Sequence, residues 1–525
     1  MLNGIFQPLK KVLDLKQMRK SNWVNPSLQA VLIVCLSTLV SYSQNFNRPV
    51  PNGLPEYEFQ RYDTTDLNSY YLSAPYPHNG GSSSYTSMML MDQDGYLVWW
   101  TGSNKKFFDF KYHPNHNVLS YTQRNGATMW HYVMNTSFEV IDSITAPQGY
   151  GDVHEFQIFP NGNYCFLGVT DTVVDLSNMM FNGSPGSATT HLNNLIIWEF
   201  TSNHDLVMRW SSAEHIPADA FIDFYNYNPN AFDYLHGNAI ELDTDGNLLV
   251  SMRTANAIYK VNHTTGSIMW RLGGNYNEFT FLNDSGFIGQ HDVRRTANGN
   301  ITLFDNQIGT ASGSRCLEYE LDHNDSTAFL VNEYSYNWPL NCFSLGSYRQ
   351  LDNGYQIIGW GNTNRPEPSF TLLDSDQNIA ADVFFKDTVV TYRAFFEAFE
   401  SAVGQPEISC FNDGTTLWLS APQGYQYYLW STGENTQTIA APNSGEYLVW
   451  VNQGIGSLGS KPLQISDPST HCLTVGFTDQ KPENSNIESL GYFDLTGRKL
   501  QAIQRGTIYL ERFSSGKCIK HITWE

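Results

Sequence analysis

The chain has 525 residues, which is more than one domain of usual size requires. Aromatic residues make up 14% and charged residues 15%, with 40 glycines, a composition that favours a turn-rich β protein and excludes a coiled coil or a disordered chain. The formal net charge of −21 makes nucleic acid and anionic membrane surfaces poor partners, so a small anionic ligand would require a locally cationic pocket.

Residues 1–44 have the pattern of a signal peptide. A basic region that ends near Lys20 precedes the apolar run 28–40, and small and polar residues follow it. This run is shorter than the roughly 20 residues that a membrane-spanning helix needs, so no transmembrane segment is predicted. An exported chain permits disulfides, and the candidate pairs are Cys410–Cys472, which brackets a small domain, and Cys316–Cys342.

A turn of the Asp/Asn-Gly type that leads into an apolar strand recurs between residues 45 and 404. The copies are 91–100, 159–168, 243–252, 296–305 and 351–360, and a weaker copy without the glycine, 113–122, makes six. Such turns are typical of β-hairpins, and the later copies recur at about 53 residues, close to the length of a four-stranded propeller blade. We therefore predict an all-β fold with a six-bladed β-propeller over 45–404.

One interval between these turns, from Gly162 to Gly246, is longer than the others and predicts loops on one face of the propeller. Its second half is rich in aromatic residues. Two interpretations stay open: local packing under a long loop, or an aromatic wall for a flat apolar ligand. The second interpretation makes Phe224, Tyr225 and Tyr227 candidate substrate-binding residues.

The composition changes after residue 404. Residues 405–477 alternate apolar and polar residues between regular turns, which predicts a small Ig-like β-sandwich. Residues 478–525 comprise a polar linker and several short strands around glycine-containing turns. The chain is thus expected to contain a propeller, a sandwich and a short β-rich C-terminal domain.

Three histidines, His154, His236 and His291, precede the repeated turns by similar distances. Equivalent positions in successive blades lie on one ring around the central channel, so we expect these imidazoles to converge. Arg253 ends the strand that follows His236, and Asn238 shares a strand face with His236. Together they would form an anion-binding pocket. Strand alternation directs the neighbouring Glu155 and Asp292 away from it.

Two other interpretations of these histidines were weighed. A histidine at the start of a strand can be purely structural, although three in equivalent register favour a site. Three histidines can also hold zinc, but Arg253 would repel a cation and local ligand pairs are absent. Neither a metal nor another cofactor is therefore predicted.

Four segments of the propeller resemble the arylsulfotransferase (aryl-sulfate sulfotransferase, ASST) family. They are "DVHEFQIFPNGN" (152–163), "LHGNAIELDTDGNLLVSMR" (235–253), "QHDVRRTANGNITLFDN" (290–306) and "SYRQLDNGYQIIGWG" (347–361). The resemblance implies a six-bladed propeller that moves a sulfuryl group from a phenolic sulfate ester to a phenolic acceptor without the nucleotide donor PAPS.

The same resemblance implies roles for the site residues. His291 resembles the nucleophile that becomes transiently sulfated. His154, His236 and Arg253 resemble the residues that hold the sulfuryl group and assist the leaving oxygen, with Asn238 alongside. Either His154 or His236 would then donate a proton to the departing phenolate.

The C-terminal segments "YFDLTGRKL" (492–500) and "GTIYLERFSSGKCIKHI" (506–522) are similar to the sorting domain of the type IX secretion system of Bacteroidota. The segment 405–477 resembles Ig-like modules that are common in such proteins. These resemblances imply type IX secretion machinery as a partner and export through the periplasm to the cell surface or the medium.

The sequence therefore predicts an exported, PAPS-independent arylsulfotransferase that works through a sulfohistidine intermediate with ping-pong kinetics. Two alternatives stay open. The first is a non-catalytic exported propeller that binds phenolic or glycan ligands. The second is a metal-dependent propeller lyase or hydrolase, which a chelator would inhibit.

Overall fold

The computed structural model describes residues 46–78, 86–181, 183–221, 227–363, 367–472, 489–493, 498–501, 508–513 and 518–522. The predicted signal peptide, residues 1–44, lies outside these ranges. The chain divides into two compact units, residues 1–404 with 453–457, and residues 405–452 with 458–525. Within the described ranges, no helix combines the length and the apolar character that spanning a membrane would require.

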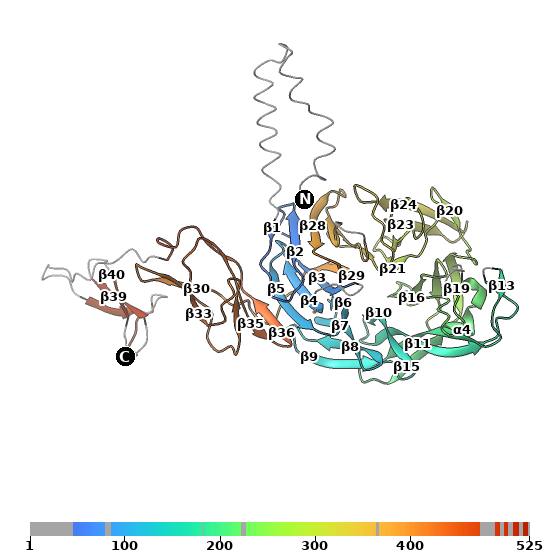
Figure 1. Cartoon of the computed structure of the whole chain (residues 1–525), viewed down its shortest axis with the longest axis horizontal. Coiled ribbons are helices and arrows are strands. Elements are labelled where there is room, and N and C mark those ends of the chain that lie inside the picture. Colours follow the sequence, from blue (N-terminus) through green and yellow to red (C-terminus); the bar gives the residue numbers. More distant parts are fainter. Residues whose placement is uncertain are drawn as a thin grey trace, which may run out of the picture. The chain divides into compact units, whose positions relative to one another are not determined.

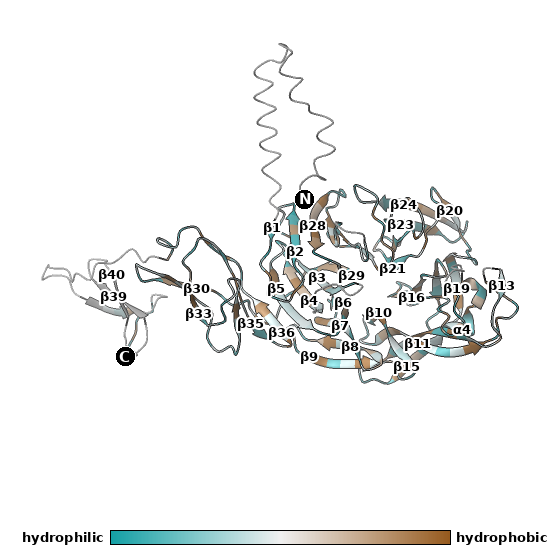
Figure 2. Ribbon diagram, in the orientation of Figure 1, coloured by the Kyte–Doolittle hydropathy of each residue, from teal (hydrophilic) through white to brown (hydrophobic). Residues whose placement is uncertain are grey.

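The predicted all-β propeller is confirmed. The described part of the first unit contains six large sheets, one for each blade, and each is built on four antiparallel strands (Figure 1). Strands inside the blades, such as β17 (Leu248–Met252) and β22 (Ile301–Asp305), are buried along their whole length because each blade packs between two others. Figure 2 shows apolar residues, coloured brown, on strands of several blades.

In blades 2 to 4, the four strands of each blade pair in the order in which they occur in the chain. Blade 2 consists of β6 (Phe107–His113), β7 (Val118–Asn125), β8 (Thr128–Met134) and β9 (Val140–Thr145). Blade 3 consists of β10 (Tyr150–Ile158), β11 (Tyr164–Val174), β14 (Thr190–Phe200) and β15 (Leu206–Ser211). Blade 4 consists of β16 (Gly237–Leu242), β17, β18 (Ala257–Val261) and β19 (Ile268–Gly273).

Blades 5 and 6 each carry additional edge strands. Blade 5 consists of β21 (His291–Arg295), β22, β23 (Arg315–Asp322) and β24 (Thr327–Tyr334), with β20 (Thr280–Leu282) parallel to β24. Blade 6 consists of β25 (Ser347–Gln350), β26 (Gln356–Gly359), β27 (Phe370–Leu373) and β28 (Ile379–Phe385), extended by β2 (Tyr57–Arg61) and β1 (Phe46–Asn47).

Blade 1 closes the ring with strands from both ends of the propeller sequence. Its innermost strand is β29 (Val389–Glu397), which pairs with β3 (Tyr70–Pro77), followed by β4 (Thr86–Asp92) and β5 (Leu97–Ser103). The antiparallel pairing of β29 with β3 joins the two ends, while β2 pairs with β28 in the neighbouring sheet. The ring is thus held closed at two places.

The repeated turns occupy equivalent places in five of the six blades. The turns that start at 113, 159, 243, 296 and 351 join the innermost strand to the second strand of blades 2 to 6. The turn near Gly95 instead joins β4 to β5, because the two inner strands of blade 1 are not consecutive in the chain. At Gly162, a φ of +87° and a hydrogen bond from its N–H to the Phe159 carbonyl (2.8 Å) close a tight hairpin.

The innermost strands of five blades contain a β-bulge or similar irregularity. The pairing register shifts between Thr391 and Ala394 in β29, Phe108 and Lys111 in β6, Gly151 and Phe156 in β10, Gly237 and Ala239 in β16, and His291 and Arg294 in β21. A bulge interrupts the two-residue alternation and re-aims side chains. Asp109, His236 and Asp292, at or beside these bulges, have φ values of +51°, +50° and +56°.

The long interval between Gly162 and Gly246 forms a packed excursion from blades 3 and 4. It contains β12 (Met180–Phe181), β13 (Ser184–Pro185), the short helix α4 (Ser212–His215) and the 3₁₀ turn η1 (Ala218–Ala220). Buried apolar residues from this excursion share one core with strands of both blades.

The second unit also consists of antiparallel strands. One sheet contains β30 (Ser409–Asn412), β31 (Leu417–Ser420) and β33 (Thr438–Ala440), and a second pairs β34 (Gly445–Tyr447) with β37 (Leu463–Ile465). Strand β32 (Tyr428–Trp430) pairs with β35 (Val449–Gln453), and β36 (Gly456–Gly459) follows. Near the C-terminus β38 (Ser489–Phe493), β39 (Ile508–Phe513) and β40 (Cys518–Ile522) form a three-stranded sheet. The Ig-like and sorting assignments stay predictions.

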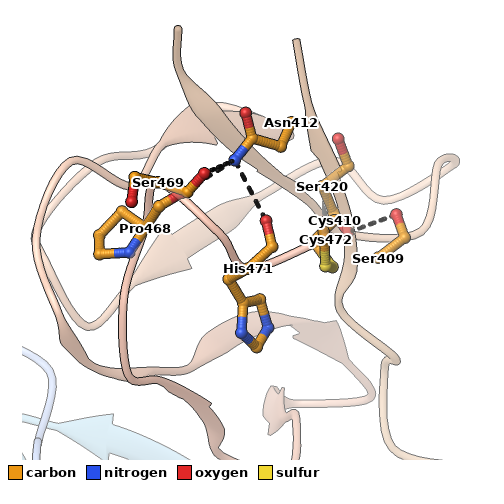
Figure 3. The surroundings of a disulfide bond; sticks show 8 residues. All are labelled: Ser409, Cys410, Asn412, Ser420, Pro468, Ser469, His471 and Cys472. Carbon is orange, nitrogen blue, oxygen red and sulfur yellow. Dashed lines mark hydrogen bonds between the residues drawn. A yellow bond between two sulfur atoms is a disulfide. The ribbon is translucent and has the colours of Figure 1, made fainter. Parts of the chain in front are cut away.

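One of the two candidate disulfides is formed. Cys410 in β30 is bonded to Cys472, with a Cα–Cα distance of 6.1 Å (Figure 3). Asn412 supports the same corner, because its Nδ2 donates to the carbonyls of Pro468 (2.9 Å) and His471 (3.2 Å). The Cys316–Cys342 pairing is wrong: both thiols are free and buried in the apolar core between blades 5 and 6.

Candidate functional site

His154 and His236 lie against each other at one end of the central channel. His154 is in the irregular part of β10, and His236 directly precedes β16, so the two come from adjacent blades. Their ring centroids are 4.9 Å apart at an interplanar angle of 75°. The expected convergence of these two imidazoles therefore occurs.

His291 and Arg253 complete the group. His291 begins β21 and is 1% exposed, and both Arg253 and the two other histidines act on its charge. The main-chain N–H of Arg253 donates to the His236 carbonyl at 3.0 Å, and its Nη2 reaches the Phe343 carbonyl at 3.5 Å. The side chains of three histidines and one arginine, from blades 3, 4 and 5, thus gather at this end of the channel.

Each imidazole has a hydrogen-bond partner at Nδ1. Asp152 accepts from His154 and Asp233 accepts from His236, both at 2.5 Å. Nδ1 of His291 instead lies 2.7 Å from Oδ1 of Asn306 and 3.1 Å from the Gly289 carbonyl. None of these partners was identified from the sequence, because strand periodicity does not report which side chains meet at the strand ends.

The surroundings separate the pKa values of two of the histidines. Burial would lower the pKa of His236, but the hydrogen bond and charge of Asp233 raise it above the usual value. Burial and then the positive charge of Arg253 lower the pKa of His291 well below its usual value. The two pKa shifts have opposite signs, so His291 favours the neutral imidazole, and His236 keeps its proton to a higher pH than an unperturbed imidazole would.

Asn238 lies at the bulge of β16 and is fully buried. Its Nδ2 donates to the carbonyl of Gln290 (2.7 Å), the residue before His291, and so links blade 4 to blade 5. The main-chain carbonyl of Asn238 accepts a hydrogen bond from the Tyr392 hydroxyl (3.1 Å). The ring centroid of Tyr392 lies 5.4 Å from that of His154. Asn238 and Tyr392 thus form the floor beneath the imidazoles, and substrate contact by Asn238 stays a prediction.

A buried network of ion pairs fills the channel beneath this floor. Arg393 contacts Asp109 (2.8 Å), Glu155 (3.1 Å) and Asp292 (3.2 Å). Lys111 and Arg294 each contact Glu155 at 2.7 Å. Although burial raises the pKa of Glu155, the charges of Arg294, Arg393 and Lys111 hold it well below its usual value. The prediction that strand alternation leaves Glu155 and Asp292 outside the channel is wrong, because the bulges in β10 and β21 place both carboxylates in this network.

The opposite end of the channel contains a separate cavity of about 320 Å³. Its lining comes from the distal ends of the innermost strands and the turns that follow them, including Lys111, Arg294, Arg349 and Glu397. Since the ion network also includes Lys111 and Arg294, it separates this cavity from the histidines.

The aromatic candidates of the long excursion are only partly described. Phe224 and Tyr225 lie outside the described residues. Tyr227 stacks on Phe181 at 3.8 Å and packs edge-on against Phe232 at 5.2 Å, and its hydroxyl accepts from the N–H of Ser187 (2.7 Å). These contacts are those of local packing, and a role in substrate binding stays a prediction.

Among the described residues, one group of three donor atoms is close enough to hold a metal ion: Cys410, His471 and Cys472. Both cysteines of this group are bonded to each other, so they offer no thiolate ligands (Figure 3). The group lies in the second unit, apart from the three channel histidines.

The fold and site define a six-bladed propeller with histidines and an arginine gathered at one channel mouth. Residues 110–380 match the model of the arylsulfotransferase (ASST) family. Because this match covers more than half of the chain, the protein belongs to that family, and the resemblance seen in its motifs is confirmed. Comparison with curated proteins gives no match.

Solved structures give distant likenesses. A protein of unknown function from Bacteroides caccae is 12% identical with a TM-score of 0.40, covering 62% of this chain and 97% of that chain. TolB from Acinetobacter baumannii is 13% identical with a TM-score of 0.34, covering 63% and 68%. Virginiamycin B lyase from Staphylococcus aureus is 11% identical with a TM-score of 0.32, covering 70% and 96%. These likenesses carry no argument about activity.

Proposed function

We propose that the protein is a PAPS-independent arylsulfotransferase that moves a sulfuryl group from a phenolic sulfate ester to a phenolic acceptor through a sulfated His291. Membership of the arylsulfotransferase family supports the reaction class. The observation that carries the proposal is the convergence of a neutral His291 with Arg253, His154 and His236 at one channel mouth.

In the first half-reaction, Nε2 of His291 attacks the sulfur, the N–S bond forms and the bond from sulfur to the phenolic oxygen breaks. By analogy with phosphoryl transfer, charge spreads over the non-bridging oxygens, which the guanidinium of Arg253 is placed to hold. A departing phenolate has a conjugate acid with a pKa near 10, so it takes a proton from a neighbouring imidazolium. The raised pKa of His236 favours His236 as this donor.

In the second half-reaction, the same imidazole, now neutral, accepts the proton of the incoming phenol. The phenolic oxygen attacks the sulfur, the S–O bond forms and the N–S bond breaks, which returns His291 to its starting state. Donor and acceptor therefore occupy the site in turn, and ping-pong kinetics are expected.

We also propose that the protein is exported and that its C-terminal segment is recognised by type IX secretion machinery. The signal-peptide pattern and the tail motifs support this proposal. The Cys410–Cys472 disulfide is consistent with an oxidising compartment. Fusion of residues 478–525 to a periplasmic reporter in a type IX-competent host should release that reporter to the surface or the medium.

The proposed reaction is tested with a chromogenic aryl sulfate and a phenol acceptor. Wild-type protein should release the chromogenic phenolate and carry a sulfuryl adduct on the peptide that contains His291 when the acceptor is withheld. His291→Ala should lose more than about 1000-fold in turnover. His116→Ala, at the opposite mouth, is the control. Equal turnover by wild type and His291→Ala would refute the mechanism.

A further inference from the structure

Asn306 holds the nucleophilic histidine in a defined orientation. It follows β22, is 2% exposed, and ends the same sequence stretch that begins at Gln290. Its Nδ2 donates to the carbonyls of Cys342 and Leu345, both at 2.9 Å. Because two acceptors face the amide nitrogen, the amide oxygen must be the atom that faces His291.

This orientation determines which nitrogen of His291 carries the proton. Oδ1 of Asn306 and the carbonyl of Gly289 are both acceptors, and both lie within hydrogen-bond distance of Nδ1. Nδ1 must therefore be the protonated nitrogen, and in a neutral imidazole Nε2 then keeps its lone pair. The two hydrogen bonds that the His291 ring makes among the described residues are both at Nδ1.

The partner of His291 differs in charge from the partners of the other two imidazoles. Carboxylates of Asp152 and Asp233 face Nδ1 of His154 and His236, and a carboxylate stabilises an imidazolium. An amide oxygen orients the ring without adding a negative charge. The charged and titratable groups that face His291 from neighbouring elements are Arg253, His154 and His236, which all oppose its protonation.

We propose that Asn306 is the positioning residue that assigns the nucleophile role to His291, whereas Asp152 and Asp233 assign proton-donor chemistry to His154 and His236. This inference rests on the proposed function. Through both half-reactions the proton stays on Nδ1 of His291, where it is hydrogen-bonded to the amide oxygen of Asn306. Only Nε2 forms and breaks a bond to sulfur. The proton given to the phenolate comes from a carboxylate-paired imidazole.

The first test needs no activity. Protein labelled with ¹⁵N at histidine should show His291 as the neutral tautomer protonated at Nδ1 between about pH 6 and 8, because burial and the charge of Arg253 hold its pKa well below the usual value near 6.5. The signal is assigned by its loss in His291→Gln. A tautomer protonated at Nε2, or a ring that is charged at pH 7, would overturn the inference whatever the enzymatic result.

The second test replaces Asn306, the hydrogen-bond partner of His291 Nδ1, by a carboxylate. In Asn306→Asp the carboxylate still accepts from Nδ1, so the tautomer is kept while the protonation midpoint of His291 should move upward by about 1–3 pH units. The acid limb of kcat/KM against pH should move upward by the same amount, with activity recovering at higher pH. Equal loss at every pH with an unmoved NMR midpoint would assign Asn306 a structural role only.

These readouts distinguish the two proposals. If aryl sulfates are not turned over but the spectra show the expected tautomer and shift, the proposed function fails and the ring orientation stands. Should Asn306→Asp not fold, the tautomer of the wild-type protein still decides the assignment.

Discussion

At the scale of single residues, the site combines one fixed cation with imidazoles of different protonation. Arg253 lies between the backbone of His236 and the Phe343 carbonyl, and its charge acts on both His236 and His291. A guanidinium cannot lose its proton near neutral pH, so it supplies positive charge that does not depend on the reaction step. In the proposed reaction, the imidazoles can therefore exchange protons while Arg253 continues to bind the sulfuryl oxygens.

Arg253→Lys should test whether the geometry of the guanidinium, and not only its charge, is needed at this position. A lysine keeps the charge but not the two-pronged geometry, so we expect kcat for aryl sulfate turnover to fall about 100-fold. Arg209→Lys, at a surface pair with Glu214, is the matched control and should be near wild type. An unchanged kcat in Arg253→Lys would show that charge alone suffices at this position.

Asp233→Asn should shift the pH dependence. Asp233 raises the pKa of His236, and the asparagine removes that negative charge, so the pKa of His236 should fall. If protonated His236 is the proton donor, it loses its proton at lower pH, and the alkaline limb of kcat/KM should move down by about one pH unit. Asp142→Asn, at the exposed pair with His204, serves as control. A fixed alkaline limb would instead point to His154.

The three histidines could be predicted from the sequence because repeat register places equivalent positions of a propeller on one ring, and Arg253 could be added because it ends the strand that follows His236. Their partners could not. Asp233 lies three residues before His236, and the chain turns between them with a φ of +50° at His236. Asn306 reaches His291 because it follows β22, the strand that pairs with β21. Tertiary contacts of this kind leave no periodic signal in the chain.

At the scale of elements, the bulges in the innermost strands decide what fills the channel. Regular alternation would send Glu155 and Asp292 away from it. The register shifts in β10 and β21 allow a histidine and its neighbouring carboxylate to serve different layers, the imidazole at the mouth and the carboxylate in the network below. A sequence pattern with period two cannot reveal this, because a bulge interrupts that period.

Arg393→Met should weaken the propeller strongly. Arg393 is fully buried and contacts carboxylates from three other blades, so its loss leaves unpaired buried charges. We expect the free energy of unfolding to fall by about 3–5 kcal/mol, measured by chemical denaturation. Lys386→Met, which removes an exposed pair with Glu56, should cost no more than about 1 kcal/mol. Similar losses in both variants would contradict a special role for the network.

At the scale of the whole molecule, the candidate site lies in the first unit, and the second unit carries the disulfide. The Cys410–Cys472 bond closes a loop with a sequence separation of 62 residues. In the chain-entropy description, such a closure stabilises the folded state by about 4 kcal/mol. The Cys410–Cys472 pair was a candidate because it brackets a predicted domain, whereas Cys316 and Cys342 lie in one buried cluster without a bond between them.

Cys410→Ser combined with Cys472→Ser should therefore lower the melting temperature of the second unit in calorimetry. Turnover of an aryl sulfate at 25 °C should stay within about twofold of wild type, because every residue of the candidate site lies in the first unit. A parallel loss of turnover and of the second transition would show that the two units are energetically coupled.

The closing strand of the ring has a consequence for the timing of activity during synthesis. Strand β29 ends at Glu397 and supplies Tyr392 beneath the imidazoles, although its partner β3 is made more than 300 residues earlier. A ribosome delivers these strands in order, so a nascent chain halted before Val389 would contain His154, His236 and His291 and yet lack Tyr392, which packs beneath them. The pocket should thus mature in one late step, and a chain truncated there should be inert until a peptide spanning 389–397 is added.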